Sequence, residues 1–577
     1  MSEHSHTAGC CEPHPANTAR ASFAGVAPAE RTASPHRREN ADKAELLVSG
    51  SLITMDDAAP RAEAMAVAAG RILAVGSRAD LESFVGPATR ILEHKTGSIL
   101  PGFVEPHLHL VSSALVFDGV DCSPYTNKTL DAVLAALKAA TATTPQGQTV
   151  VGQLFDPSLL LGQPDLTAAL LDQISTDVPI VVMNASQHFF YVNSAAYAAA
   201  GITADTTNPP GGDYGARNGV LTGIVAESAA MLSFVKLLPA LTPEVISAAI
   251  TGIAALAARA GVTYIHEPAT GAIAGVKEVD LLHQTFGRAG FPVRGSLSLW
   301  GLSLDDFIAA GIVPGSGDDR LRSQTVKWVS DGSNQGYTGF MRQNYLRRDT
   351  RGVANFTQQE LEANFAKTIA AQWPIMCHAN GDAAMDMVIA AFDSAAQLPG
   401  WDPAKRHRTE HSSLLRDEHI AAMARLGVTP SFLMNHVRLW GRVMRDDILG
   451  PERADLLDRY GSAVKAGLRA SFHCDFSVSP IGPLNYIATA AARTMADGGE
   501  VLNPAERVPV AQALKGSTLD AAWMCHADGL AGSLAAGKAA DFVLLGDDPL
   551  AHEADPDAVR DIAVLATYLD GEEVHSA

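Results

Sequence analysis

The stretch that most constrains this chain is residues 99–110, ILPGFVEPHLHL, a short apolar run that ends in two closely spaced histidines. On a β-strand alternate side chains share one face, so His107 and His109 point the same way. Two imidazoles at the end of a buried strand, next to Glu105, can form half of a divalent metal site. The segment therefore predicts a strand that carries metal ligands at its carboxyl end. A pair of purely structural histidines is the alternative.

Seven further apolar runs alternate with Ala- and Leu-rich helical stretches, which is the pattern of parallel βα units. Together with the first segment they make eight strands, the number found in a closed (β/α)₈ or TIM barrel. Most of them end in polar residues, as expected where the carboxyl ends of the strands carry the chemistry. We therefore expect an α/β fold built on a TIM barrel, with the later strands beginning near residues 261, 292, 325, 374, 407, 428 and 468.

The two ends of the chain have a different texture, with short β-like segments separated by Gly turns. We expect residues 43–98 and 527–577 to form one small β-sandwich domain, with the barrel at 99–526 between them. Residues 111–240 lie between the first and second barrel strands and do not follow the barrel pattern. We therefore expect them to form an insertion that acts as a lid over the catalytic face.

Residues 1–42 are rich in Ala, Pro, Ser and Thr and show no periodicity. Such a composition cannot bury enough apolar surface to offset the entropy of ordering, so we expect a disordered tail. Its histidines and cysteines could hold a metal, but an incidental polar tail is the simpler interpretation.

Composition and charge exclude several classes of protein. The chain has 577 residues, of which 47% are hydrophobic, enough for a large core, and its formal net charge is -20. The chain has no evident stripe of basic residues, so we do not expect it to bind nucleic acid. No run of 18 apolar residues and no signal peptide is evident, so we expect no membrane association and a cytoplasmic location. The six cysteines lack disulfide-type spacing, which suits a reducing compartment. A homodimer is compatible with the sequence, which leaves the oligomeric state open.

Residues with metal-ligand chemistry end four of the later strands. A barrel brings the carboxyl ends of its strands together around one axis, so these side chains are expected to meet the histidine pair. The resulting N- and O-rich set suits Zn²⁺, Mn²⁺ or Fe²⁺ better than a metal that prefers thiolates. Cys377 and Cys474 each precede a ligand, so strand alternation turns their thiols away. The four additional candidates are Lys327, His378, His411 and Asp475.

In these motifs the chain resembles the metal-dependent amidohydrolase superfamily, and within it the YtcJ-like branch that includes N-substituted formamide deformylases. The resemblance covers residues 44–577 and implies a TIM barrel, a small β-sandwich and hydrolysis of amide or other C–N bonds by metal-activated water. One departure is Glu105, where many members have Asp. The motifs are PGFVEPHLHL, VKWVSDGS, CHANGD, RTEHS, HCDFSVSP and GSLAAGKAADFVLLGDDP.

The resemblance implies roles for the candidate ligands. His107, His109 and Asp475 would hold the more buried metal, and Lys327, as a carbamate, would bridge it to a second one. The second metal would be held by the two later histidines, His378 and His411, which would orient the substrate if only one metal binds. Asp475 would take a proton from water and pass it to the leaving nitrogen. The expected cofactor is Zn²⁺, one or two ions per chain, with Mn²⁺ or Fe²⁺ as alternatives.

Three expectations concern the substrate, a small amide-type molecule such as an N-acyl or N-formyl amine. His188, in the insertion, is expected to contact it and to help polarise its carbonyl in catalysis. Asp331 is assigned to substrate binding, and with Asn380 and Asp382 it is also a candidate for supporting ligands or capping loops. Two alternatives stay open: an isomerase or decarboxylase on the same fold, and a catalytically dead regulatory or binding relative, against which the complete ligand set argues.

Overall fold

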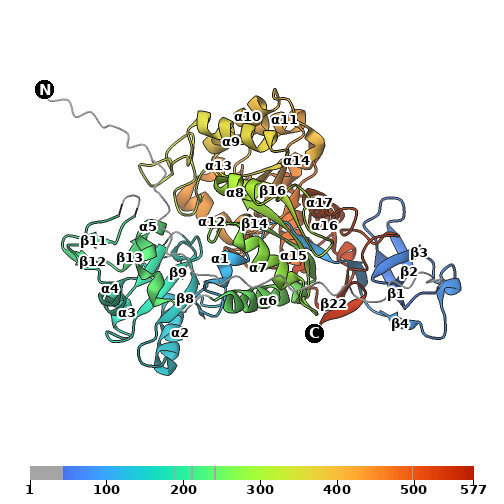
Figure 1. Ribbon diagram of the computed structural model, residues 1–577, viewed down its shortest axis with the longest axis horizontal. Helices are drawn as coiled ribbons and strands as arrows, with labels where there is room; N and C mark the ends of the chain where they lie inside the picture. Colours follow the sequence, from blue (N-terminus) through green and yellow to red (C-terminus); the bar gives the residue numbers. More distant parts are fainter. Residues whose placement is uncertain (1–42, 161, 188, 210–211, 239–241, 497) are drawn as a thin grey trace.

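The computed structural model describes residues 43–577 except 161, 188, 210–211, 239–241 and 497. Figure 1 shows three parts, with the barrel in the middle, a sheet from the chain ends on one side and the insertion on the other. The predictions for residues 1–42 and for His188 lie outside the described residues.

The eight predicted barrel strands form one parallel sheet whose order follows the sequence. A parallel bridge between Leu108 and Phe476 joins the segments that follow the first and last strands, and the amide of Asp475 donates to the carbonyl of His107 at 3.1 Å. The ring is thereby closed, which confirms the predicted TIM barrel. Its strands are β6 (Phe103–Glu105), β14 (Val262–Thr270), β15 (Arg294–Trp300), β16 (Leu321–Val329), β17 (Ile375–Ala379), β18 (Arg408–His411), β19 (Thr429–Phe432) and β20 (Ser471–Phe472).

Helices cover the barrel because each presents an apolar face to the strands. The N-terminus of α6 is capped by its own first residues: the Thr242 side chain accepts a hydrogen bond from the amide of Val245, and Pro243 occupies the first turn.

In the described part of the chain, no helix has the length and apolar character that a bilayer crossing requires. The covering helices are α6 (Pro243–Arg259), α7 (Lys277–Phe286), α8 (Leu304–Ala309), α9 (Gln358–Ala370), α10 (Asp382–Ala395), α11 (Asp417–Leu426), α14 (Tyr460–Lys465), α15 (Pro483–Ala492), α16 (Val510–Gly516) and α17 (Leu519–Met524).

Strands from both chain ends share one eight-stranded sheet, in the order β23-β22-β21-β5-β1-β2-β3 with β4 paired to β1. The two ends therefore build a common β-domain, while its division into two sandwich layers stays a prediction. Residues 99–110 serve both parts, because the chain leaves this sheet after Pro101 and enters the barrel at Phe103. The strands are β1 (Leu46–Ile53), β2 (Arg61–Ala68), β3 (Arg71–Gly76), β4 (Arg90–Glu93), β5 (Ser98–Pro101), β21 (Phe542–Leu545), β22 (Val564–Leu569) and β23 (Glu572–Ser576).

A buried ion pair connects this sheet to the barrel. Arg294, at the start of β15, donates from Nε to Asp541 at 2.7 Å and from Nη2 to the same carboxylate at 3.1 Å. Asp570 receives a further hydrogen bond from the same guanidinium. Because Arg294 and Asp541 are both excluded from water, Asp541 depends on Arg294 for its charge compensation.

The insertion between β6 and β14 is a folded unit with its own five-stranded sheet, in the order β13-β10-β9-β8-β7. Two apolar clusters on this sheet give it a core separate from that of the barrel. Gln187 donates from Nε2 to the hydroxyl of Ser477 at 3.2 Å, which ties the insertion to the segment after β20. The strands are β7 (Val120–Asp121), β8 (Val150–Phe155), β9 (Ile180–Asn184), β10 (Phe189–Val192) and β13 (Ile224–Ala226).

Candidate metal centre

The six predicted ligands meet at the carboxyl end of the barrel. His107 is fully buried beneath a cavity of about 550 Å³, and the other five line that cavity. They come from five different strand ends, so the sheet closure is what assembles them. The five are His109, Lys327, His378, His411 and Asp475.

Three of these residues form a tight N, N, O group. The Nε2 atoms of His107 and His109 each lie 3.2 Å from Oδ1 of Asp475. Nε2 of His107 and Oδ1 of Asp475 are buried and have no hydrogen-bond partner. Buried polar atoms without partners are costly, and their convergence is explained by a cation between them. Imidazole nitrogen and carboxylate oxygen are the ligands that Zn²⁺, Mn²⁺ and Fe²⁺ take, so the donor set fits such a metal.

The imidazole of His107 is oriented by Glu410, whose Oε2 accepts from Nδ1 at 2.5 Å. The other oxygen of Glu410 lies 2.8 Å from Nε of Arg408, and all three side chains are excluded from water. Burial lowers the pKa of His107, and the nearby Lys327 lowers it further. The ring is therefore neutral, with its proton on Nδ1 and its Nε2 lone pair facing Asp475.

Asp475 is held in its ionised form by neighbouring imidazoles. Burial by itself raises the pKa of this carboxyl, but the neighbouring His411 and His109 outweigh burial and bring the pKa below its ordinary value. Its second oxygen lies 3.8 Å from Nδ1 of His411. An ionised carboxylate in this position can serve as a ligand and as a proton acceptor.

His378 and His411 lie side by side, with ring centroids 4.5 Å apart. Nε2 of His378 faces the carbonyl of Gly332 at 3.0 Å, which leaves Nδ1 for a ligand role. Nδ1 of His411 faces Nε2 of His473 at 3.1 Å, which leaves Nε2 of His411 for a ligand role. Each ring thus keeps one nitrogen for a metal or a substrate.

Lys327 lines the cavity, while Val326 and Trp328 on either side of it pack in the apolar core. Alternation along the strand thus places Lys327 on the face opposite its two apolar neighbours. Burial lowers the pKa of the Lys327 ammonium, although Glu410 and Asp475 oppose this effect. Burial favours the neutral amine.

Two side chains of the site, His473 and Glu410, were not predicted from the sequence. His473 stacks on His107 with centroids 4.7 Å apart and can join it and His411 in a second three-residue group. The spacing His473-x-Asp475 repeats that of His107-x-His109 and was the signal available. Glu410 had no such signal, because alternation places it on the face opposite His411.

The contacts of Asp331 are with backbone amides. Its Oδ1 accepts from Asn380 at 3.0 Å, and its Oδ2 accepts from Gly381 and Phe340 at 2.8 Å each. These bonds tie the loop after β17 to the loop after β16, and Oδ1 lies 3.3 Å from Nε2 of His378. The contacts favour a positioning role, and substrate binding by Asp331 stays a prediction.

Four other residues singled out in the sequence lie apart from the ligand group. Asp382 pairs with Arg416 at 2.6 Å at the start of α10. Glu105 does not extend the histidine pair: its Oε1 accepts from the amide of Cys474 at 3.1 Å, away from the cavity. Cys377 and Cys474 pack in the apolar core, as alternation predicted.

Comparison with known proteins gives three findings. A model described as "Amidohydrolase family" matches residues 96–575. The N-substituted formamide deformylase of Arthrobacter pascens is 28% identical over 551 residues, which cover 91% of this chain and 97% of that protein. The YtcJ amidohydrolase of Bacillus subtilis (strain 168) is 26% identical over 532 residues, which cover 91% of this chain and 98% of that protein.

Among solved structures, an uncharacterized metal-dependent hydrolase from Pyrococcus horikoshii OT3 superimposes with a TM-score of 0.69 at 21% identity. The match covers 88% of this chain and 98% of that one. Similarity at this level of identity concerns the fold.

Proposed function

The chain belongs to the amidohydrolase family, and from this premise we propose that it is a metal-dependent enzyme that hydrolyses a C–N bond of a small amide-type substrate. The observation that carries the proposal is the group formed by His107, His109 and Asp475. Two of its ligand atoms are buried, lack hydrogen-bond partners and lie 3.2 Å apart. Without a cation this arrangement leaves a costly pair of uncompensated polar atoms.

In the proposed mechanism, His107, His109 and Asp475 would hold a divalent metal, with Zn²⁺ favoured. When bound, such a metal supplies Lewis acidity and makes water nucleophilic at neutral pH. Asp475 takes the proton from the attacking water, because its carboxylate is ionised and borders the cavity. It then gives that proton to the leaving nitrogen, so that an amine and a carboxylic acid are the products.

We further propose that Lys327 reacts with CO₂ to form a carbamate and that His378 and His411 complete a second metal site. A neutral amine is the form that reacts with CO₂, and burial favours that form at Lys327. The carbamate would replace a cationic group, which repels metal ions, by an anionic group with two oxygen ligands.

For the substrate we propose an N-formyl or N-acyl amine. The support is the similarity to an N-substituted formamide deformylase along 97% of that protein's length. The insertion serves as a lid in this proposal, since Ser186 and Gln187 line the metal-centre cavity together with the ligands. An isomerase or decarboxylase that uses the same ligands is the alternative, and it would release no amine.

The test is metal analysis combined with a substrate screen. Purified full-length protein is expected to carry one to two equivalents of transition metal and to release amine from N-formyl or N-acyl amines. Chelation should remove metal and activity together, and added Zn²⁺ should restore both. An active preparation with an empty site would contradict the proposed metal mechanism. A loaded enzyme that releases amine from no compound in the screen would contradict C–N hydrolysis.

A further inference from the structure

His436 is an imidazole of the metal-centre cavity that the proposed mechanism does not use. It lines this cavity together with the candidate ligands. It is also the first residue of η6 (His436–Trp440), a π-helical turn that follows β19. Turns of this kind are rare and occur frequently at functional sites. His436 is therefore a candidate for direct contact with the substrate.

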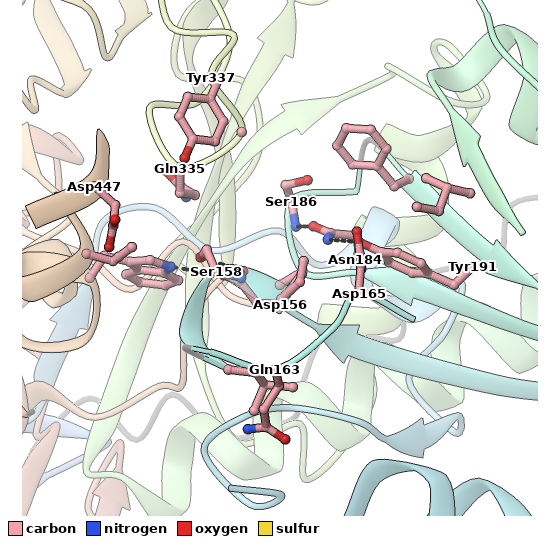
Figure 2. A pocket seen from close by; sticks show the side chains of 18 of the residues that line it. Asp156, Ser158, Gln163, Asp165, Asn184, Ser186, Tyr191, Gln335, Tyr337 and Asp447 are labelled. Carbon is pink, nitrogen blue, oxygen red and sulfur yellow. Dashed lines mark hydrogen bonds between the residues drawn. The ribbon is translucent and has the colours of Figure 1, made fainter. Parts of the chain in front are cut away.

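The ring of His436 is held in place from the insertion as well as from the barrel. Trp440, at the other end of η6, lines a second cavity of about 890 Å³ between these two parts. Its Nε1 donates to Asp156 of the insertion at 2.9 Å, and Figure 2 shows Asp156 beside Ser158 in the wall of that cavity. The imidazole of His436 packs edge-on against the indole, with ring centroids 5.7 Å apart.

The Nδ1 atom of His436 faces two acceptors. The hydroxyl of Ser413 lies 3.3 Å from Nδ1, and it donates its single hydrogen to Oδ1 of Asn380 at 2.6 Å. Ser413 can therefore only accept from His436, which places a proton on Nδ1. Oδ1 of Asp458 lies 3.8 Å from the same nitrogen and is the second acceptor.

Asp458 is a fully buried carboxyl group whose two oxygens have no hydrogen-bond partner. Its backbone is fixed, because its amide donates to the carbonyl of Ser413 at 2.9 Å and its carbonyl accepts from Nη1 of Arg493 at 2.9 Å. Buried oxygens without partners are costly, and the N–H at Nδ1 of His436 faces one of them. The two residues form a carboxyl–imidazole pair, an arrangement that fixes the tautomer of a catalytic histidine.

With its proton on Nδ1, the neutral ring of His436 presents the lone pair of Nε2. Among the described residues no group hydrogen-bonds to this Nε2, and it is not one of the atoms closed off from the cavity. The neighbouring polar groups are already engaged, Ser413 with Asn380 and Nδ2 of Asn380 with the carbonyl of Gly332 at 2.7 Å. Nε2 of His436 is therefore an uncommitted acceptor.

The place of His436 relative to the ligands indicates which group it can contact. Ser413 and Asn380, which share its hydrogen-bond network, follow the candidate ligands His411 and His378 by two residues each. They lie one step beyond the ligands toward the mouth of the barrel, because a strand rises about 3.3 Å per residue. When the carbonyl of a substrate lies at the ligands, the N–H of a trans amide points away from that oxygen, toward this outer layer.

We propose that His436 is a further catalytic residue, that its Nε2 accepts a hydrogen bond from the N–H of the scissile amide, and that Asp458 positions it by holding the proton on Nδ1. The inference rests on the proposed C–N hydrolysis and deepens it, since it names secondary amides as the substrate class. The hydrogen bond orients the leaving nitrogen toward Asp475, which supplies its proton. A tertiary amide has no N–H group and cannot make this contact.

The test compares N-propylformamide with its tertiary counterpart, N-methyl-N-propylformamide, on the metal-loaded full-length enzyme. His436→Phe removes the acceptor and should lower kcat/KM for the secondary amide by about three- to tenfold, the effect of one neutral hydrogen bond, without a matching loss for the tertiary amide. His436→Gln, whose amide oxygen can accept the same N–H, should keep most of the secondary-to-tertiary ratio. His552→Phe, the same replacement in η9 (Pro549–His552), should leave the ratio intact.

Asp458→Asn tests the positioning role. The Asn side chain keeps the shape of Asp but offers an N–H to Nδ1 of His436, which favours the tautomer with its proton on Nε2. The secondary-to-tertiary ratio should therefore fall as it does in His436→Phe. Thermal melting verifies the fold of each variant, and an unchanged metal content shows that the metal centre is intact.

Two results would overturn the proposal. Equal losses for both amides in His436→Phe, or no loss for either, would mean that His436 does not bind the N–H group. A wild-type ratio in Asp458→Asn would mean that the carboxyl group does not position the ring.

Binding separates a failure of this contact from a failure of the proposed function. Calorimetric titration with N-propylmethanesulfonamide and its N-methyl derivative needs no turnover. If no formamide is hydrolysed, the proposed function fails, while a preference for the N–H compound that falls about three- to tenfold in His436→Phe still supports the contact. The same preference in the wild type and in His436→Phe, or no binding of either compound by the wild type, overturns it.

Discussion

His107 and Glu410 form a carboxylate–imidazole pair inside the closed barrel, with Nδ1 of the histidine 2.5 Å from Oε2 of the glutamate. Neither side chain is exposed to solvent. The pair holds the ring so that Nε2 points at Oδ1 of Asp475, 3.2 Å away. A partner of this kind sets the tautomer of a ligand histidine and raises its basicity.

Glu410→Gln should therefore weaken metal binding without removing a ligand. Loss of such a partner costs roughly 10- to 100-fold in metal affinity. Competition of the protein with a chromogenic chelator measures the change, with Glu452→Gln at an exposed position as the control. Equal affinities of the two variants would show that His107 does not depend on Glu410.

Asp475→Asn should retain metal and lose turnover. The amide can still coordinate through its oxygen but cannot carry a proton, and general acid–base steps contribute typically about 10²- to 10⁴-fold. Metal content and kcat measured on the same preparation separate the two roles. A near-normal kcat would assign the proton transfer to another residue.

Lys327→Ala should abolish binding of a second metal, because the bridging carbamate can no longer form. Added short carboxylic acids are expected to restore part of it by filling the space with two oxygens. Metal stoichiometry with and without propionate measures both effects. Intact mass of the active wild type provides the control, and a bare lysine in a two-metal enzyme would contradict the bridge.

Arg294→Met should destabilise the junction between the terminal sheet and the barrel. Removing one partner of a buried pair leaves Asp541 as an uncompensated charge, at a cost of about 3–5 kcal/mol in the free energy of unfolding. Arg61→Met removes a more exposed pair with Asp548 and should cost about 0–1 kcal/mol. Denaturant titration compares them, and equal costs would mean that the buried pair is not a joint between the two parts.

The buried imidazole of His407 should make the free energy of unfolding fall in acid. Burial lowers its pKa to about 4, and its Nδ1 accepts from the amide of Ile375 at 3.0 Å, which requires the unprotonated ring. The unfolded residue has a pKa of about 6.5, so between these values the unfolded state binds more protons. The contribution of His407 is complete above about pH 6.5 and is lost as the pH falls through about 4.

His407→Asn should flatten this dependence, since the Asn side chain can accept the same amide hydrogen bond but does not titrate. The change is expected to amount to about 1.4 kcal/mol less loss per pH unit in that window. Denaturant titrations between pH 4.5 and 7 measure it, and an unchanged slope would assign the acid sensitivity to other groups.

The sequence by itself determined the barrel and most of the candidate ligands. Eight apolar runs separated by helical stretches allow few other arrangements, because parallel strands need helical crossovers. The alternation of side chains placed the thiols of Cys377 and Cys474 in the core. Local periodicity is sufficient for such features, since each depends on a few neighbouring residues.

The tertiary structure decided which of these residues act together and which others join them. Glu410 precedes His411, and strand alternation would turn it away from the site. At His411 the backbone takes a left-handed conformation, φ 61°, that ends the alternation and lets both side chains serve the site. His473 is adjacent to His107 only because the first and last strands meet when the barrel closes.

The same reason applies to the wall of the metal-centre cavity. Gln335 and Ser186 are far apart in the sequence, yet both line that cavity. Their proximity follows from how the insertion packs on the barrel loops, a relationship between surfaces that leaves no periodic mark in either segment. Sequence patterns record what one strand or helix buries, while contacts between separately folded parts exist only once the whole chain has packed.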